Sequence, residues 1–216
     1  MARLKLAVLI SGRGSNLQAL IDACRDPAYP AEIALVISND PAAPGLARAQ
    51  AAKIPTRVVD HRDYSDRALF EAAMTAAIEA SGANLVCLAG FMRLLGSEFV
   101  RRWRDRLINI HPSLLPAFKG LHTHARAIEA GVRVAGCTVH FVRADMDQGP
   151  IIVQAAVPVL PSDDAEALAA RVLAEEHVVY PLAVRLIAEG RVKVVAERVV
   201  IADAAAPEGA LVNPAP

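Results

Sequence analysis

The sequence has no excess of charge of either sign, because its 23 Lys and Arg residues equal its 23 Asp and Glu residues in number. Proteins that bind long nucleic acids usually carry a basic stripe or patch, so this balance argues against a nucleic-acid partner. It leaves room for a small phosphorylated ligand, which needs only a local anion site. No apolar run approaches the roughly 20 residues of a membrane span, so we expect no membrane partner.

Cysteine is also scarce, and its spacing argues against the common cysteine-based sites. Cys24, Cys87 and Cys137 are far apart and form no C-x-x-C or zinc-type spacing. We therefore expect reduced, buried thiols in a cytoplasmic protein. The apolar start, residues 4–10, is too short for a signal peptide and runs into a polar, Gly-rich loop, so we expect no secretory leader.

What the sequence does contain is the composition of a folded domain. Apolar residues make up 54% of the chain and charged residues 21%, which is typical of a globular protein. Short apolar runs alternate with stretches of helical periodicity. We predict strands at 4–10, 33–38, 56–59, 85–89, 107–110, 134–142 and 151–157, and a final strand or hairpin at 192–201. We predict helices at 17–24, up to about residue 53, at 64–80, near 97–103 and at 163–187.

This alternation predicts an α/β fold with a single doubly wound, mostly parallel sheet. The strands at 134–142 and 151–157 are joined by a loop alone, so they form a late antiparallel part. We predict one domain over residues 1–202. Residues 203–216 are rich in Ala and Pro and are predicted to be a disordered C-terminal tail.

A Gly-rich loop, residues 11–16, follows the first predicted strand and opens the first predicted helix. Backbone N–H groups at a helix N-terminus bind anions, and glycines let the ligand come close. The loop, with Gly14, Ser15 and Asn16, is therefore a candidate phosphate site. A dinucleotide site is one alternative, although Leu17 stands at the third glycine of that fingerprint. A plain strand–turn–helix connection without a ligand is the other.

Asn109 and His111 lie where the strand at 107–110 ends. Alternation along a strand places their side chains on one side and turns Ile110 towards the core. Ligands of open α/β sheets bind beyond the carboxyl ends of the strands. An amide and an imidazole at this edge could stabilise an oxygen on which negative charge develops. Alternatively, His111 is a structural residue of a loop that is stiffened by the prolines after it.

An acidic loop joins the two late strands and carries Asp145 and Asp147, followed by Gly149. A carboxylate near an imidazole favours the protonated ring and could hold a water molecule. The alternative is that both acids only solvate a hairpin tip. His140, on the preceding strand, could join this cluster or be a buried core histidine.

His122 and His124 raise the possibility of a zinc site shared with His111 and Asp147. The usual structural-zinc spacings and the H-E-x-x-H motif are absent from the sequence. We therefore predict that the protein uses no metal. Thr123, between the two histidines, is a plausible helix N-cap.

Five sequence motifs occur in order along the chain, at plausible spacings. They are S-G-x-G-S-N-L-Q-A from residue 11, L-A-G-F-M-R from 88, N-I-H-P-S-L-L-P from 109, G-L-H-T-H from 120, and G-x-T-V-H-F-V from 136 with D-x-G-P-I from 147. In this order they resemble the folate-dependent phosphoribosylglycinamide formyltransferase family. The resemblance extends to Glu176-His177 and Tyr180-Pro181, and so covers nearly the whole chain.

The resemblance implies a Rossmann-like formyltransferase fold and a reaction. The expected reaction transfers the formyl group of 10-formyltetrahydrofolate to the amine of 5-phosphoribosylglycinamide (glycinamide ribonucleotide) in purine synthesis. It also implies that His111 is the catalytic acid, that Asn109 helps to stabilise the oxyanion, and that Asp147 organises proton transfer. The expected partners are these two small molecules, and the expected assembly is a monomer or homodimer.

The binding residues follow from the same resemblance. Gly14, Ser15, Asn16 and Glu176 match the family's ribonucleotide site. The matches to its folate site are Arg67, Met92, Arg93, Leu94, Leu95, Asn109, Arg143, Ala144, Asp145, Met146 and Asp147.

Three positions depart from the family pattern. Arg13 replaces a small or amide residue and Lys119 replaces a proline. Leu173 replaces a polar residue on the predicted helix at 163–187, which also carries Glu176.

Related enzymes of the family differ in added domains. Transformylases that act on methionyl-tRNA carry an added C-terminal domain, and formyltetrahydrofolate hydrolases carry an N-terminal regulatory domain. We expect neither domain here. A nicotinamide-dependent dehydrogenase and a catalytically silent folate-binding module are the alternatives from other classes.

Overall fold

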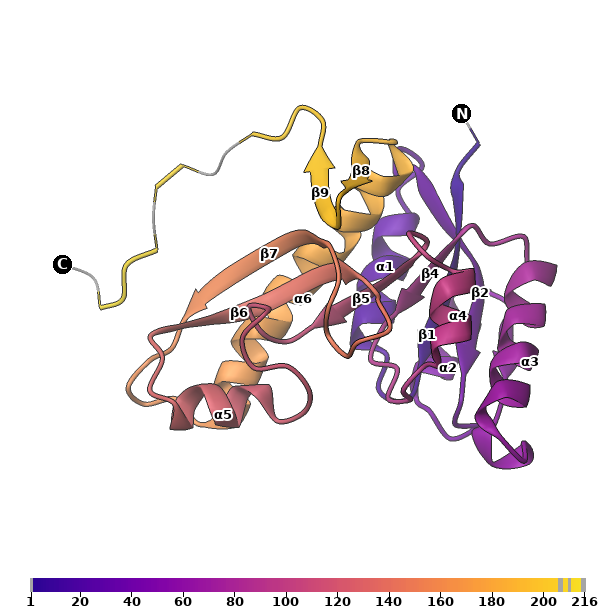
Figure 1. The fold of residues 1–216 in the computed structure, drawn as a ribbon, viewed down its shortest axis with the longest axis horizontal. Helices are drawn as coiled ribbons and strands as arrows, with labels where there is room; N and C mark the ends of the chain where they lie inside the picture. The colour runs from indigo at the N-terminus through magenta and orange to yellow at the C-terminus, as the bar shows by residue number, and fades with distance from the viewer. Residues whose placement is uncertain (1, 206–207, 210, 215–216) are drawn as a thin grey trace.

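Seven strands form one twisted sheet in the order β3-β2-β1-β4-β5-β6-β7 (Figure 1). This computed structural model describes residues 2–205, 208–209 and 211–214. Strands β3, β2, β1, β4 and β5 are parallel, whereas β6 runs antiparallel to both β5 and β7. The predicted fold class, with its late antiparallel part, is confirmed. The strands are β1 (Leu4–Ile10), β2 (Ala31–Ser38), β3 (Thr56–Val58), β4 (Leu85–Leu88), β5 (Leu107–His111), β6 (Val134–Phe141) and β7 (Ile151–Pro158).

Helices cover the two faces of the sheet unequally. On one face α1 (Ser15–Cys24), α2 (Gly45–Ala51), α5 (Thr123–Glu129) and α6 (Ala165–Ala188) form a core with alternate residues of the strands. On the other face α3 (Arg67–Ala80) and α4 (Ser97–Arg102) pack over β1, β2, β4 and the first residue of β5. This second core ends at Leu107, so the adjoining face of β5 and β6 is left to loops.

Capping side chains explain where the long helices begin. The side chain of Asp66 accepts a hydrogen bond from Leu69 N, and that of Asp164 accepts one from Ala167 N. Each aspartate is thus the N-cap, and the helices begin at Arg67 and Ala165, a few residues after the predicted starts. A short 3₁₀ turn, η1 (His61–Asp63), was not predicted.

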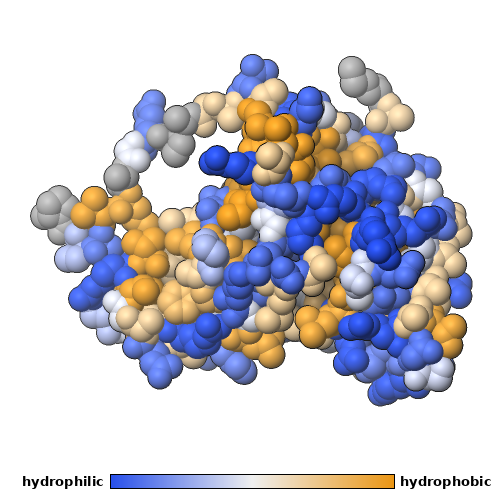
Figure 2. All heavy atoms as spheres, in the orientation of Figure 1, coloured by the Kyte–Doolittle hydropathy of each residue, from blue (hydrophilic) through white to orange (hydrophobic). Residues whose placement is uncertain are grey.

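The last two strands, β8 (Val192–Val195) and β9 (Arg198–Ile201), form a small hairpin in the range predicted as a strand or hairpin. Apolar residues gather near this hairpin on the face seen in Figure 2, where most of the surface is hydrophilic. Residues 206–207, 210 and 215–216 of the predicted tail lie outside the described residues. Within the tail, Asn213 Nδ2 donates hydrogen bonds to the backbone oxygens of Arg133 and Val159. No helix in the described residues is long and apolar enough to span a membrane.

The three cysteines are unpaired. Cys87 and Cys137 are buried as predicted, whereas Cys24 is half-buried. Burial raises the pKa of the Cys137 thiol to about 12, so this thiol stays protonated at neutral pH.

A glycine in β6 allows the close approach of the neighbouring strand, which gives a test of the sheet. A Cβ at Gly136 would lie 1.9 Å from the backbone oxygen of Ala155 in β7. We expect Gly136→Ala to lower the free energy of unfolding by about 1–3 kcal/mol, because the strands must separate. Gly12→Ala is the matched control, since nothing lies within 4 Å of its added Cβ. Urea unfolding that shows equal stability for both variants would contradict this packing.

Candidate active site

Asn109 and His111 stand on the face of β5 that α3 and α4 leave uncovered. Ile108 and Ile110, between and beside them, are buried in the core on the α6 side. Across the β5–β6 ladder, Asn109 is opposite His140 and His111 is opposite Thr138. Because directly opposed residues point to the same side of a sheet, these four polar side chains share one face.

Both ring nitrogens of His111 face oxygen acceptors. Nε2 lies 3.1 Å from the backbone oxygen of Phe118, and Nδ1 lies 3.4 Å from Asp147 Oδ1. The side chain is buried, so water does not screen it fully from the carboxylate. The ring can therefore donate from both nitrogens when it is protonated, and it can give up a proton within the site.

His140 fixes the orientation of the Asn109 amide. Burial lowers the pKa of His140, although the nearby Asp147 charge opposes this shift, so the ring is neutral at pH 7. Its Nδ1 lies 3.0 Å from the backbone oxygen of Phe141, which requires a proton on Nδ1. Nε2 is then an acceptor, and it lies 3.4 Å from Asn109 Nδ2. This contact uses one Asn109 N–H and leaves the other available to a ligand.

The loop after His111 is held by β6 and β7. Thr138 Oγ1 donates to the backbone oxygen of Ser113 at 2.7 Å and accepts from Leu115 N at 3.0 Å. Gln154 Nε2 donates to the backbone oxygen of Leu115 at 3.0 Å. These bonds fix the backbone directly behind the imidazole.

Asp147 joins two loops in an uncommon backbone conformation. Its φ is +50°, in the left-handed region, and Gly149 follows with φ +132°. Oδ1 faces His111, while Oδ2 accepts a hydrogen bond of 2.7 Å from Gly120 N. The carboxylate therefore links the imidazole to the loop at 112–122.

The Gly-rich loop has the geometry of an anion site. Gly14, with φ +69°, is the N-cap of α1. The first N–H groups of a helix have no intrahelical partner, and at Gly14 no cap side chain binds them. A Cβ at Gly14 would lie 2.7 Å from Gly45 Cα, which shows how closely α2 packs on the loop. Gly45 N also donates to the backbone oxygen of Gly12 at 3.0 Å.

Asn16 and Glu176 meet beside this loop, although they lie far apart in the sequence. Asn16 Nδ2 donates to Glu176 Oε2 at 2.6 Å. Asn16 is only 8% exposed, and its Oδ1 has no hydrogen-bond partner within the described residues, nor has the buried Nε2 of the neighbouring His177. Buried polar atoms without partners are costly, so these two are well suited to contact a polar ligand.

The matches to the folate site fall in three places. Met92, Arg93, Leu94 and Leu95 lie in the β4–α4 segment, residues 89–96, next to Asn109 because β4 pairs with β5. Met92 and Leu94 are 68% and 70% exposed, which is unusual for apolar side chains. Arg67 Nε lies 3.8 Å from Glu71 Oε1, and Glu71 Oε1 accepts from Gly96 N at the end of the segment.

The remaining matches lie in the β6–β7 loop. Ala144, Asp145 and Met146 are exposed beside Asp147. The Arg143 guanidinium points elsewhere: its Nε lies 2.6 Å from Glu197 Oε2 and its Nη2 lies 2.7 Å from Asp105 Oδ1. Arg143 therefore anchors the base of the loop to the β8–β9 turn.

The histidines at 122 and 124 form no metal centre here, because the described residues hold no group of three or more His, Cys, Asp or Glu side chains placed to bind a metal ion. Thr123 is the first residue of α5, and the N-cap is His122. The N-cap prediction for Thr123 is wrong, because the positive φ of His122, 55°, turns the chain into the helix one residue earlier.

Two of the three departures from the family pattern lie in loops of the site, and the third lies on α6. Arg13 is exposed and its backbone oxygen accepts from Arg48 Nε at 2.9 Å. The backbone oxygen of Lys119 accepts from Arg126 Nη1 at 2.6 Å. Leu173 is half-buried on α6.

The supports of the site were not predicted from the sequence. Thr138, Gln154 and the Phe118 carbonyl hold His111 and its loop, and none was singled out. Thr138 lies opposite His111 because β5 pairs antiparallel with β6, and this pairing was not predicted from the sequence. Nothing in the sequence identifies a backbone carbonyl as a partner.

Comparison with known proteins gives the family. The model of the formyl transferase family matches residues 4–184. The chain belongs to the formyl transferase family. Phosphoribosylglycinamide formyltransferase of Haemophilus influenzae is 44% identical to this formyl transferase over 189 residues, 88% of this chain and 89% of that protein.

Solved structures and longer relatives agree with this assignment. A glycinamide ribonucleotide transformylase from Symbiobacterium toebii is 51% identical, with a TM-score of 0.91 over 93% of this chain and 95% of that one. The bovine trifunctional purine biosynthetic protein adenosine-3 is 52% identical over 189 residues. This formyl transferase spans 19% of the length of that relative.

The buried Asn16–Glu176 pair predicts a pH effect on stability. Burial raises the pKa of Glu176, and the hydrogen bond from Asn16 opposes the shift. The folded state thus binds the carboxyl proton of Glu176 more tightly than the unfolded state does. The stability that Glu176 contributes is therefore greatest below its unfolded pKa, about 4.3. This contribution is lost as the pH rises through the folded pKa. We expect Glu176→Gln to gain stability relative to the parent at pH 7 but not at pH 4, in urea unfolding. Glu175→Gln is the matched control, and an equal pH-dependent gain in both variants would contradict the prediction.

Proposed function

We propose that this chain transfers the formyl group of 10-formyltetrahydrofolate to the amine of 5-phosphoribosylglycinamide, giving formylglycinamide ribonucleotide and tetrahydrofolate. The observation that carries the proposal is the group formed by Asn109, His111 and Asp147 on the uncovered face of β5. A family match over most of the chain, and full-length relatives with the corresponding name, support it. Both folate and ribonucleotide are substrates here.

In the proposed reaction the ribonucleotide amine attacks the formyl carbon. A new C–N bond forms, and the carbonyl electron pair moves onto oxygen to give a tetrahedral oxyanion. The free N–H of Asn109 would donate to this oxygen. A protonated His111 would also donate to it, from Nε2, which would exchange the Phe118 oxygen for the oxyanion. A pre-oriented donor of this kind is worth roughly 2.7–4 kcal/mol to the transition state, and His140 supplies the orientation of the amide.

Collapse of the intermediate breaks the bond between the formyl carbon and N10 of the folate. The leaving nitrogen needs a proton, and the attacking nitrogen must lose one. His111 can deliver the proton to the leaving nitrogen and take up the proton that the attacking nitrogen loses, and its contact with Asp147 stabilises the charged ring. Proton transfer by a positioned side chain typically contributes about 10²–10⁴-fold in rate. No metal ion is needed for either step.

The two substrates would occupy separate parts of the site. The ribonucleotide phosphate suits the N-terminus of α1, at Gly14, Ser15 and Asn16, and its polar ribose or amide portion suits Glu176 and the unpartnered Asn16 Oδ1. The folate suits the exposed apolar side chains Met92 and Leu94 on one side and the β6–β7 loop on the other. Arg67 and the backbone of residues 143–147 complete the proposed folate site.

We also propose a cytoplasmic location and a monomeric or homodimeric assembly. The three unpaired thiols are typical of a reducing compartment. Sedimentation measurements with the full chain would decide the assembly.

Removal of the oxyanion donor tests the mechanism. We expect Asn109→Ala to lower kcat by about 10²–10³-fold, because one pre-oriented donor is lost. His111→Ala and Asp147→Ala should each abolish measurable turnover. The measurement is the spectrophotometric formation of tetrahydrofolate, with urea unfolding to show that each variant folds. Asn84→Ala, just before the amino end of β4, is the matched control. Normal turnover by Asp147→Ala would contradict the mechanism.

Omission of the ribonucleotide separates transfer from hydrolysis. A formyltetrahydrofolate deformylase from Pseudomonas putida is 34% identical, with a TM-score of 0.84 over 92% of this chain and 70% of that one. We expect donor consumption to depend on the ribonucleotide, since the loop at 11–16 and the Asn16–Glu176 pair are suited to a phosphorylated acceptor. Equal consumption with and without the ribonucleotide would identify a hydrolase instead.

A further inference from the structure

The β4–α4 segment, residues 89–96, has few backbone contacts although it carries exposed apolar side chains. Ala89 N donates to the backbone oxygen of Leu9 at 2.9 Å, and Gly96 N donates to Glu71 Oε1 at 2.6 Å. Residues 91–95 lie between these anchors and belong to no helix or strand. Their position therefore depends on whatever holds the middle of the segment.

Ser11 holds that middle by two hydrogen bonds. Its backbone N donates to the backbone oxygen of Gly90 at 3.2 Å, and its Oγ accepts from Met92 N at 2.7 Å. The bond to Met92 is the only one to the backbone of residues 91–95 among the residues that the structure describes. Ser11 thus joins the end of β1 to the segment that carries Met92 and Leu94.

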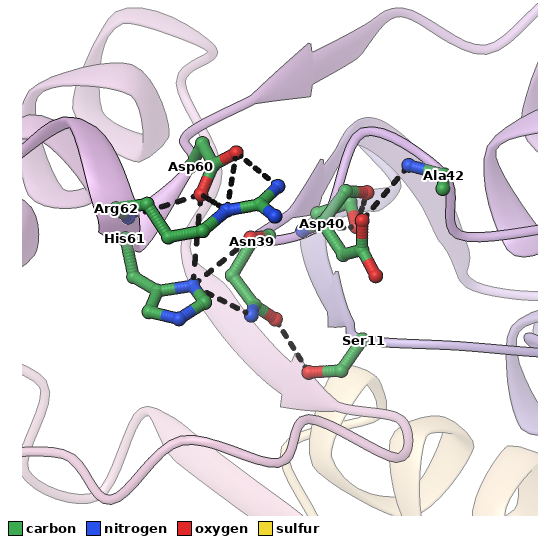
Figure 3. Close-up of polar contacts among 8 residues, drawn as sticks. Ser11, Asn39, Asp40, Ala42, Asp60, His61 and Arg62 are labelled. Carbon is green, nitrogen blue, oxygen red and sulfur yellow. Dashed lines mark hydrogen bonds and ion pairs between the residues drawn. The ribbon is translucent and has the colours of Figure 1, made fainter.

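Asn39 directs the Ser11 hydroxyl. Because Ser11 Oγ accepts from Met92 N, its own hydrogen is free to donate, and Asn39 Oδ1 accepts it at 2.5 Å. Figure 3 shows Asn39 between Ser11 and His61, and His61 Nδ1 lies 3.3 Å from Asn39 Nδ2 and from the Asn39 backbone oxygen. Asn39 is buried, so its amide has little freedom to turn.

The turn after β2 keeps Asn39 in place. Ser38 Oγ donates to the backbone oxygen of Asp40 at 2.7 Å, and Asp40 Oδ1 accepts from Ala42 N at 2.9 Å (Figure 3). On the other side, Asp60 accepts from Arg62 N at 3.0 Å and so caps the turn that carries His61. The hydrogen-bond chain from His61 through Asn39 and Ser11 to Met92 therefore starts from two fixed turns.

We propose that Ser11 and Asn39 are positioning residues for the folate substrate: together they hold the Met92 backbone so that the β4–α4 segment keeps its binding shape. This inference rests on the proposed function. Neither residue contacts the reacting groups; both act through the segment. The effect falls on the folate side because the phosphate loop has anchors of its own, from Gly45 N to the Gly12 oxygen and from Arg48 Nε to the Arg13 oxygen.

Ser11→Ala tests the proposal in two independent ways. It removes the acceptor for Met92 N, so amide hydrogen exchange at Met92 in the ligand-free protein should accelerate by at least about threefold. In the formyl-transfer assay, KM for 10-formyltetrahydrofolate should rise by about 3- to 10-fold, the range expected for one net hydrogen bond. KM for the ribonucleotide and kcat should each change by less than about twofold.

Matched variants separate positioning from a general loss of structure. Ser11→Thr keeps the hydroxyl and should restore both the Met92 exchange rate and the folate KM. Ser81→Ala removes a serine that donates to the Ile78 oxygen at 2.6 Å at the end of α3, and it should leave both readouts unchanged. Asn39→Ala should raise the folate KM less than Ser11→Ala, and the double variant should resemble Ser11→Ala, because both side chains act through one contact.

Two results would overturn the proposal. One is an unchanged Met92 exchange rate in Ser11→Ala; the other is an equal rise of both KM values, which would indicate a general disturbance of the site. The exchange measurement does not require turnover. If the parent protein transfers no formyl group and Met92 still exchanges faster in Ser11→Ala than in the parent, the proposed function is wrong but the hydrogen-bond chain is supported.

Discussion

The antiparallel pairing of β5 with β6 is the constraint on which the site depends. A parallel sheet normally carries helices on both faces, because each parallel connection crosses over through a helix. Here α5, which lies between β5 and β6 in the chain, packs with α6 on the opposite face. The face that holds Asn109 and His111 is therefore closed by loops, and loops can carry and release substrates.

The same pairing orients each catalytic candidate through a partner on β6. His140 opposite Asn109 is a neutral acceptor, because burial lowers its pKa and its Nδ1 proton is used by the Phe141 oxygen. Thr138 opposite His111 holds the loop behind the ring. Two buried imidazoles in one site thus have different tasks, and their surroundings decide which one faces a carboxylate.

The sequence predicted the strands to within about two residues, since alternating and continuous apolar runs are local signals. Strand ends and the loop between the late strands marked Asn109, His111 and Asp147 as separate candidates, and the family resemblance grouped them. The sequence could not predict the Phe118 carbonyl, the Ser11–Asn39 contact or the pairing of Arg143 with Glu197. These depend on how distant segments pack, and backbone groups have no residue signature.

In the proposed mechanism Asp147 would couple proton transfer to loop structure, whereas Asn109 would not. The two carboxylate oxygens of Asp147 face different partners, His111 and Gly120 N. These contacts also hold the left-handed backbone of Asp147, a conformation that costs a non-glycine residue about 1–2 kcal/mol. A change at Asp147 therefore alters the imidazole environment and the loop at 112–122 together. Asn109 is held within the sheet by His140, so a change there leaves both loops in place. Under the proposed mechanism, the loss of rate at Asn109 would therefore be measured with both loops in place, whereas the excess loss at Asp147 would combine the effects of proton transfer and loop order.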